Sequence, residues 1–79
     1  MVTVNVMVTV NGQPREVAPG AVVAHVVADL LGQPAVAAGG PARGIAVAVN
    51  GEVVPRASWP GTMLRDGDRI EVLTAAQGG

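Results

Sequence analysis

Two Asn-Gly dipeptides, each preceded by alternating apolar residues, constrain the fold of this chain more than any other feature. Asn11-Gly12 follows residues 2–10, in which valine occupies every even position, and Asn50-Gly51 follows the alternating residues 45–49. Alternation with a period of two is typical of a strand with one buried face, and Asn-Gly favours the positive φ angles of a two-residue hairpin turn. The sequence therefore predicts two β-hairpins, with returning strands at 13–17 and 52–54.

A single helix is predicted between the hairpins. Its apolar residues recur at i, i+3, i+4 and i+7, and they are Val23, Val26, Val27 and Leu30. Gly32 stands where a left-handed cap would end the helix. Because no Ser, Thr, Asp or Asn caps the start, and because valine is a weak helix former, we expect this helix to form only when it is docked on a sheet.

The remaining segments complete a small sheet. Residues 34–44 are rich in Ala, Gly and Pro and are predicted to form a loop. Residues 57–60 are predicted to form a helical turn that brings Trp59 onto the core, residues 66–68 a polar turn, and residues 70–74 the last strand. The first and last strands have the apolar density of central strands, whereas the returning strands contain or adjoin proline and belong at the edges.

This order of elements predicts an α+β fold, with one helix packed across one face of a mixed sheet of four to five strands. That arrangement is the β-grasp, or ubiquitin-like, architecture, in which the last strand lies in the middle of the sheet. We assign the domain to residues 1–74 and an extended, flexible C-terminal tail to residues 75–79. Because residues 1–5 are repeated as residues 7–11, either the first strand is long or residues 1–6 are an N-terminal extension.

Composition excludes several classes of function. The chain has no cysteine and one histidine, His25, so no metal site is predicted. Five scattered arginines and a net charge of −1 give no basic stripe for nucleic acid. No run reaches the roughly 18 apolar residues of a membrane span, and no basic residue precedes an apolar block at the N-terminus, as it would in a secretion signal. We therefore expect a cytoplasmic protein with no nucleic-acid or membrane partner.

The last residues indicate a carrier. The sequence stops at Gly78-Gly79, so we expect Gly79 to present a free carboxylate on an arm of small residues. An extended arm over 75–79 reaches roughly 15 Å, enough to enter another protein's active site. The alternative is a frayed end, as at most chain termini. His25 has no fitting serine or cysteine as a nucleophile, so no catalytic residue is predicted and the chain is not expected to be an enzyme.

From Ile45 onward, the sequence resembles the ThiS family, the sulfur carriers of thiamin biosynthesis. The residues that carry the resemblance are Ala46-Val-Ala-Val-Asn-Gly-Glu-Val-Val-Pro-Arg56, Trp59, Leu64, Asp66-Gly-Asp68, Ile70-Glu-Val72 and Gly78-Gly79. The first half is similar more loosely, through its opening strand and the helical segment at 20–30. It departs from the family at Val22, where threonine is frequent, and in a longer loop at 32–44.

The resemblance implies a sulfur-transfer cycle. A ubiquitin-activating-like adenylyltransferase would use ATP and magnesium to adenylate Gly79, a persulfide donor would leave a thiocarboxylate there, and thiazole synthase would take the sulfur. This chain would bind no cofactor itself. Gln77 and Gly78 would thread the channel of the partner. Arg56 and Trp59 are candidate partner contacts, although a surface arginine explains the first equally well and a core tryptophan explains the second better.

Three alternatives stay open. A carrier for molybdenum-cofactor synthesis or another sulfur pathway would share the tail chemistry, but residues 75–77 lack the aromatic and proline residues common in the molybdenum branch. A non-catalytic ubiquitin-like interaction module would give the glycines no role. A ubiquitin-type protein modifier would share the tail and end in an isopeptide bond.

Overall fold

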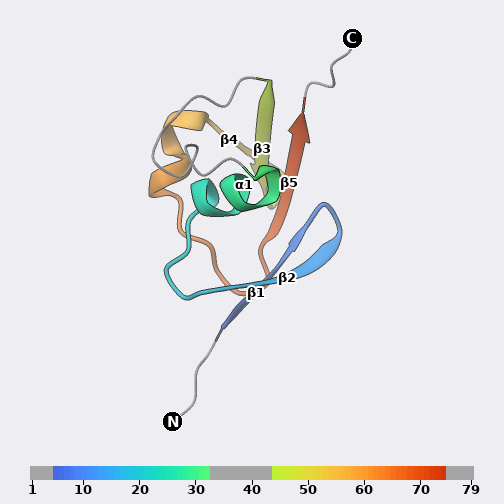
Figure 1. Cartoon of the computed structure of the whole chain (residues 1–79), viewed down its shortest axis with the longest axis vertical. Coiled ribbons are helices and arrows are strands. Elements are labelled where there is room, and N and C mark those ends of the chain that lie inside the picture. Colours follow the sequence, from blue (N-terminus) through green and yellow to red (C-terminus); the bar gives the residue numbers. More distant parts are fainter. Residues whose placement is uncertain (1–4, 33–43, 75–79) are drawn as a thin grey trace.

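The computed structural model describes residues 5–32 and 44–74 of the 79-residue chain. Within them, five strands, one α-helix and one 3-10 helix follow one another in the predicted order (Figure 1). The elements are β1 (Val6–Val10), β2 (Gln13–Val17), α1 (Val23–Leu31), β3 (Ile45–Val49), β4 (Glu52–Val54), η1 (Arg56–Gly61) and β5 (Arg69–Thr74).

The five strands form one mixed sheet in the order β2-β1-β5-β3-β4. Strand β5 lies in the centre, parallel to β1 and antiparallel to β3, and each hairpin adds its second strand at an edge. Edge strand β2 contains Pro14, which cannot donate to a ladder, and Pro55 follows directly after edge strand β4. The predicted α+β fold, with the last strand in the middle of the sheet, is confirmed.

Both hairpins turn at their Asn-Gly dipeptides. Asn11 and Gly12 have φ angles of 51° and 83°, and Asn50 and Gly51 have φ angles of 53° and 84°. Two successive positive φ angles match the right-handed twist of the flanking strands, and asparagine and glycine adopt them at little cost. The two predicted turns are therefore confirmed, and they fix the register of both outer strands.

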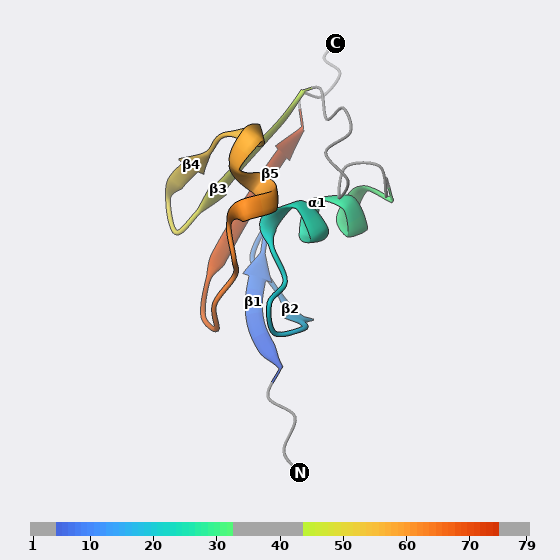
Figure 2. The same cartoon turned by 90° about the vertical axis from the view of Figure 1, so that its left-hand side faces the viewer.

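One face of the sheet carries the core. Helix α1 covers this face and η1 packs beside it (Figure 2). Alternate residues of the central strands point at the helix, and Val8, Val23, Val27, Val47 and Ile70 are buried almost completely. The core is aliphatic apart from Trp59, which is 2% exposed, and its indole Nε1 donates to the carbonyl oxygen of Val54 at 2.9 Å.

The ends of helix α1 match the sequence expectation. Its N-cap, Val22, is extended (φ −118°, ψ 166°) and gives no side-chain cap. The first turn is held instead by the Val23 backbone N–H, which donates to the Thr62 carbonyl at 2.9 Å, and by His25 Nδ1, which accepts from the Val22 N–H at 3.5 Å. Gly32 ends the helix with a φ angle of 64°. The helix thus depends on contacts with its neighbours for its start.

The prediction that Leu30 continues the buried stripe is wrong. Leu30 is 39% exposed, while the helix buries Ala24 and Ala28 together with its valines. The cause is the register of β2, which places Gln13 opposite Val10 and Arg15 opposite Val8, so polar side chains lie beneath the last turn of α1. A helical stripe needs an apolar surface to cover, and at this corner Gln13 and Arg15 line the groove beside Leu30 together with Val10.

Some predicted segments fall outside the described residues. These are residues 1–4, residues 33–43, which include most of the predicted loop at 34–44, and the tail over 75–79. Strand β1 begins at Val6, which is half-buried against the core and pairs with Val17. The hypothesis of an N-terminal extension therefore stays a prediction, with Val6 belonging to the strand.

Candidate functional site

The end of β5 is the base from which the tail would extend. Val72 is buried, whereas Leu73 is 67% exposed and Thr74 is exposed. Strand β3 pairs with β5 as far as Thr74, opposite Ile45. At this end of the sheet, a shallow, mostly apolar hollow of about 400 Å³ is lined by Gly44, Ile45, Ala46, Leu73 and Thr74. Gln77, Gly78 and Gly79, predicted to carry the chemistry, lie outside the described residues.

The side chain of Asn11 holds β5 just before that end. Its Oδ1 accepts from the Val72 N–H at 2.8 Å, and its Nδ2 donates to the Val72 carbonyl at 3.2 Å. One amide therefore satisfies both backbone groups of one peptide position. Sequence reasoning missed this contact because the Asn-Gly dipeptide was already explained by its turn.

The start of β5 is braced by a second asparagine. Asn50 Oδ1 accepts from the Arg69 N–H at 2.9 Å, and Asn50 Nδ2 donates to Asp68 Oδ1 at 3.0 Å. Asp68 Oδ2 accepts from the Arg65 N–H at 2.8 Å, and Asp66 Oδ1 accepts from the Met7 N–H at 2.8 Å. The two aspartates are thus structural members of a turn, as predicted.

Among the described elements, no helix covers the sheet face opposite α1, and this face carries exposed apolar side chains. Because alternate strand residues point to opposite faces, residues next to the buried valines lie on this open face. Three of them are large and exposed: Val53 at 76%, Leu73 at 67% and Met7 at 47%. The small residue Ala46 lies opposite Leu73 in the register. This surface, called the open face below, adjoins the base of the tail.

The two candidate partner contacts lie in η1. Arg56 begins this helix and is exposed, so its place is compatible with a partner contact. Trp59 is buried, and its indole is bonded to the Val54 carbonyl within the core. The interpretation of Trp59 as a core residue is confirmed, and its alternative as an exposed partner contact is wrong, because its ring has almost no accessible surface.

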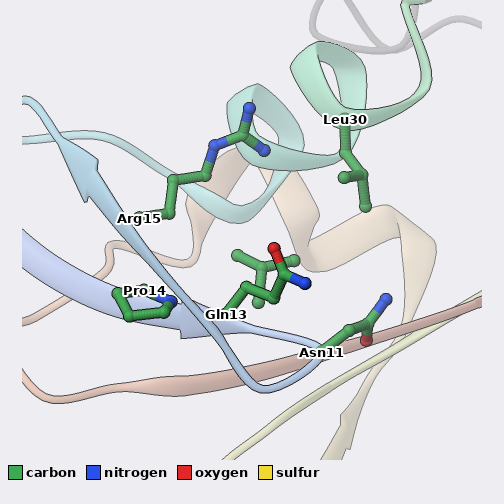
Figure 3. Close-up of a pocket in the computed structure, with 6 residues that line it drawn as sticks. Asn11, Gln13, Pro14, Arg15 and Leu30 are labelled. Carbon is green, nitrogen blue, oxygen red and sulfur yellow. The ribbon is translucent and has the colours of Figure 1, made fainter.

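A groove of about 480 Å³ lies between the first hairpin and α1 (Figure 3). Its lining includes Leu30 and Gln13, and Arg15 Nη2 contacts Asp29 Oδ2 at 2.7 Å nearby. Neither Arg56 nor Trp59 lines it. An exposed ion pair of this kind adds little to stability, and the groove contains neither of the candidate site residues that the structure describes.

The side-chain hydrogen bonds of His25 and Thr62 lie within the described part of the chain. His25 Nδ1 is occupied by the Val22 N–H, and Thr62 Oγ1 donates to the Ser58 carbonyl, so the two side chains are not paired as base and nucleophile. Over residues 5–32 and 44–74, no three His, Asp or Glu side chains are grouped closely enough to hold a metal ion. Neither of the two helices in these ranges could span a bilayer.

Comparison with known proteins identifies the family. The ThiS family model matches residues 8–79, which is nearly the whole chain. The crystal structure of the thiamine biosynthesis protein ThiS from Geobacter metallireducens is similar, with 32% sequence identity and a TM-score of 0.66 over 92% of this chain and 99% of that one. No curated protein matches the chain. With the β-grasp topology described above, these findings show that the chain belongs to the ThiS family of sulfur-carrier proteins.

Proposed function

We propose that this protein carries sulfur for thiazole formation in thiamin biosynthesis, bound as a thiocarboxylate at Gly79. The observation that carries the proposal is the family match, which runs from residue 8 through the final Gly78-Gly79 pair. The central position of β5 supports it, because the strand that leads to the tail is flanked by β1 and β3. The residues that lead into the tail are therefore held within the sheet.

The chemistry begins at the Gly79 carboxylate. An oxygen of this carboxylate attacks the α-phosphate of ATP, pyrophosphate leaves, and an acyl-adenylate forms. A persulfide sulfur then displaces AMP, and cleavage of the sulfur–sulfur bond by a thiol leaves the thiocarboxylate. Thiazole synthase takes up this sulfur. Glycine suits both steps because no Cβ obstructs the approach to its carbonyl.

The partner supplies the catalytic groups. A carboxylate is a poor acyl donor until its oxygen becomes part of a leaving group, and positive charge is needed where the phosphates react. In the proposal, a ubiquitin-activating-like adenylyltransferase binds ATP and magnesium in the cytoplasm, and the carrier binds neither. The carrier contributes its carboxylate, the Gln77-Gly78 segment that enters the partner's channel, and a surface that fits.

The open face is the surface best suited to that fit. Leu73 and Val53 expose most of their side chains there, and the small residue Ala46 lies beside Leu73. Exposed aliphatic side chains beside the reactive tail can be buried by a partner while the tail enters its site. Arg56, which is exposed on η1, is a candidate polar contact.

Intact-mass measurement tests the proposal. The chain is incubated with a ThiS-activating adenylyltransferase, ATP, magnesium and a persulfide donor. The expected result is a mass gain equal to replacement of one oxygen by sulfur, and thiazole formation when thiazole synthase is added. Deletion of Gly79 and the Gly78→Val substitution are matched controls that should prevent the gain without lowering the melting temperature.

Other outcomes separate the alternatives. A mass gain with sulfur delivered only to a molybdenum-cofactor enzyme would move the protein to that pathway. Transfer of the whole chain to a lysine of another protein would indicate a modifier. An unchanged mass under conditions that load a known ThiS protein would leave only the interaction module and contradict the proposal.

A further inference from the structure

We infer that Asn11 is a positioning residue for sulfur loading, because its side-chain amide fixes the end of β5 from which the reactive tail departs. The inference rests on the proposed function. It assigns to a turn residue a second task that its position in a hairpin does not require. Figure 3 shows Asn11 at the end of the first hairpin, beside the ribbon of β5.

The pairing between β1 and β5 is short. It joins Thr9 with Arg69 and Val10 with Ile70, and its backbone bonds end where the Asn11 N–H donates to the Ile70 carbonyl at 2.9 Å. Beyond this point the chain turns away at Asn11, whose φ angle is 51°. The next backbone groups of β5 on this side therefore have no strand residue to pair with.

The Asn11 amide takes the place of that missing strand residue. Its oxygen accepts a hydrogen bond from the Val72 N–H at 2.8 Å, and its nitrogen donates one to the Val72 carbonyl at 3.2 Å. On the other side, β3 continues along β5 to Thr74. With the amide in place, β5 is held on both sides up to Val72. Without it, residues 71–74 of β5 are held by β3 alone.

Only asparagine combines the required properties at this position. The residue must tolerate a positive φ angle, which glycine and asparagine do best. It must also offer one donor and one acceptor on a short side chain, which glycine lacks and which an ionised aspartate offers only as acceptors. Asn11→Gly therefore keeps the turn and removes the clamp, whereas Asn11→Asp keeps only the bond from the Val72 N–H.

The chain contains a matched control in Asn50. This residue also precedes a glycine, has a φ angle of 53°, and makes two side-chain hydrogen bonds at β5. Its contacts are with Asp68 and Arg69, at the start of the strand and remote from the tail. Asn50→Gly thus also removes two side-chain hydrogen bonds, one from the Arg69 N–H and one to the Asp68 carboxylate, and adds the same backbone freedom, but at the end of β5 that is remote from the tail.

Hydrogen exchange tests the clamp independently of any activity. In Asn11→Gly, the Val72 amide loses its acceptor, so its exchange should accelerate at least tenfold relative to the amide of Ala48 in β3, measured by NMR. In Asn50→Gly, the ratio of the two exchange rates should change less than twofold. An unchanged ratio in Asn11→Gly would overturn the clamp.

Loading kinetics test the positioning role. They are measured by intact mass with the adenylyltransferase, ATP, magnesium and persulfide donor, well below the melting temperatures of all proteins. When the base of the tail is less firmly held, the tail must be ordered on binding, which lowers the rate of loading. We therefore expect kcat/KM to fall about fivefold in Asn11→Gly and less than twofold in Asn50→Gly. The fall in Asn11→Asp should lie between these values.

The outcomes distinguish this inference from the function on which it rests. If the unaltered chain gains no sulfur, the proposed function fails, and the loading role of Asn11 fails with it. If the unaltered chain is loaded and Asn11→Gly is loaded as fast as Asn50→Gly, the function stands and only the positioning role is overturned. A fall in kcat/KM confined to the Asn11 variants supports both.

Discussion

Individual residues show how burial decides between two explanations of the same side chain. Trp59, the only aromatic residue, could have been an interface anchor or a core residue, and its 2% exposure makes it core. The bond from its indole to the Val54 carbonyl joins η1 to the end of β4. Arg56, three residues earlier, is exposed and keeps its candidate role. Within η1, Trp59 therefore belongs to the core and Arg56 lies on the surface.

Substitution of Trp59 should affect stability and spare loading. Trp59→Phe removes the donor to the Val54 carbonyl and leaves space beneath η1, so the free energy of unfolding should fall by about 1–3 kcal/mol, measured by urea denaturation with far-UV circular dichroism. Val53→Ala, at a 76% exposed position, should change it by less than about 0.5 kcal/mol. A sulfur-loading rate that fell in Trp59→Phe under folded conditions would contradict the core assignment.

Residue patterns predicted some roles and missed others for identifiable reasons. The turn positions of Asn11 and Asn50 follow from the dipeptide alone, but their bonds to β5 depend on which strand the topology brings beside each turn. The same limit explains the exposure of Leu30. Its helical spacing is a local pattern, whereas the polar side chains of Gln13 and Arg15 beneath it come from a distant part of the sequence. Contacts between segments distant in sequence leave no periodic signal.

At the level of elements, the strands were predictable because each carries its own signal. Alternation of apolar residues identifies β1 and β3, prolines identify the edges, and Gly32 marks the end of α1, where its φ angle is 64°. The helix start was the weakest signal, and the structure supplies it from outside, through the Thr62 carbonyl. The start of the helix therefore had a weaker local signal than the strands, whereas its end at Gly32 was predicted correctly.

The open face gives an element-scale prediction. Leu73→Glu places a charge on the exposed face of β5, beside the tail, and should lower kcat/KM for sulfur loading at least tenfold, because burying that charge against a partner is costly. Loading is followed by intact mass. Met63→Glu is the control, since Met63 is similarly exposed, at 62%, but lies in the connection between η1 and β5 that bridges to Val22 beside α1. Equal losses in the two variants would exclude a specific role for the open face.

At the scale of the whole molecule, the N-terminal boundary is open to a direct test. Asn5 Nδ2 donates to Glu16 Oε2 at 2.8 Å, and Val6 is half-buried against the core. Removal of residues 1–6 should lower the melting temperature by roughly 4–8 °C, the shift produced by about 1 kcal/mol in a domain of this size. Removal of residues 1–4 leaves both contacts in place and should cost much less. The melting temperatures are measured by thermal denaturation. Equal melting temperatures for the two truncated proteins would place the start of the domain after Val6.

The neighbour relation of β1 and β5 has a consequence for biosynthesis. These strands lie side by side in the sheet but are separated by every other element in the sequence. A nascent polypeptide that has been synthesised as far as η1 contains both hairpins but lacks β5, the strand that joins them. It therefore also lacks the core residues Ile70 and Val72. Because such long-range pairing closes late, the sheet cannot be completed before β5 has been synthesised.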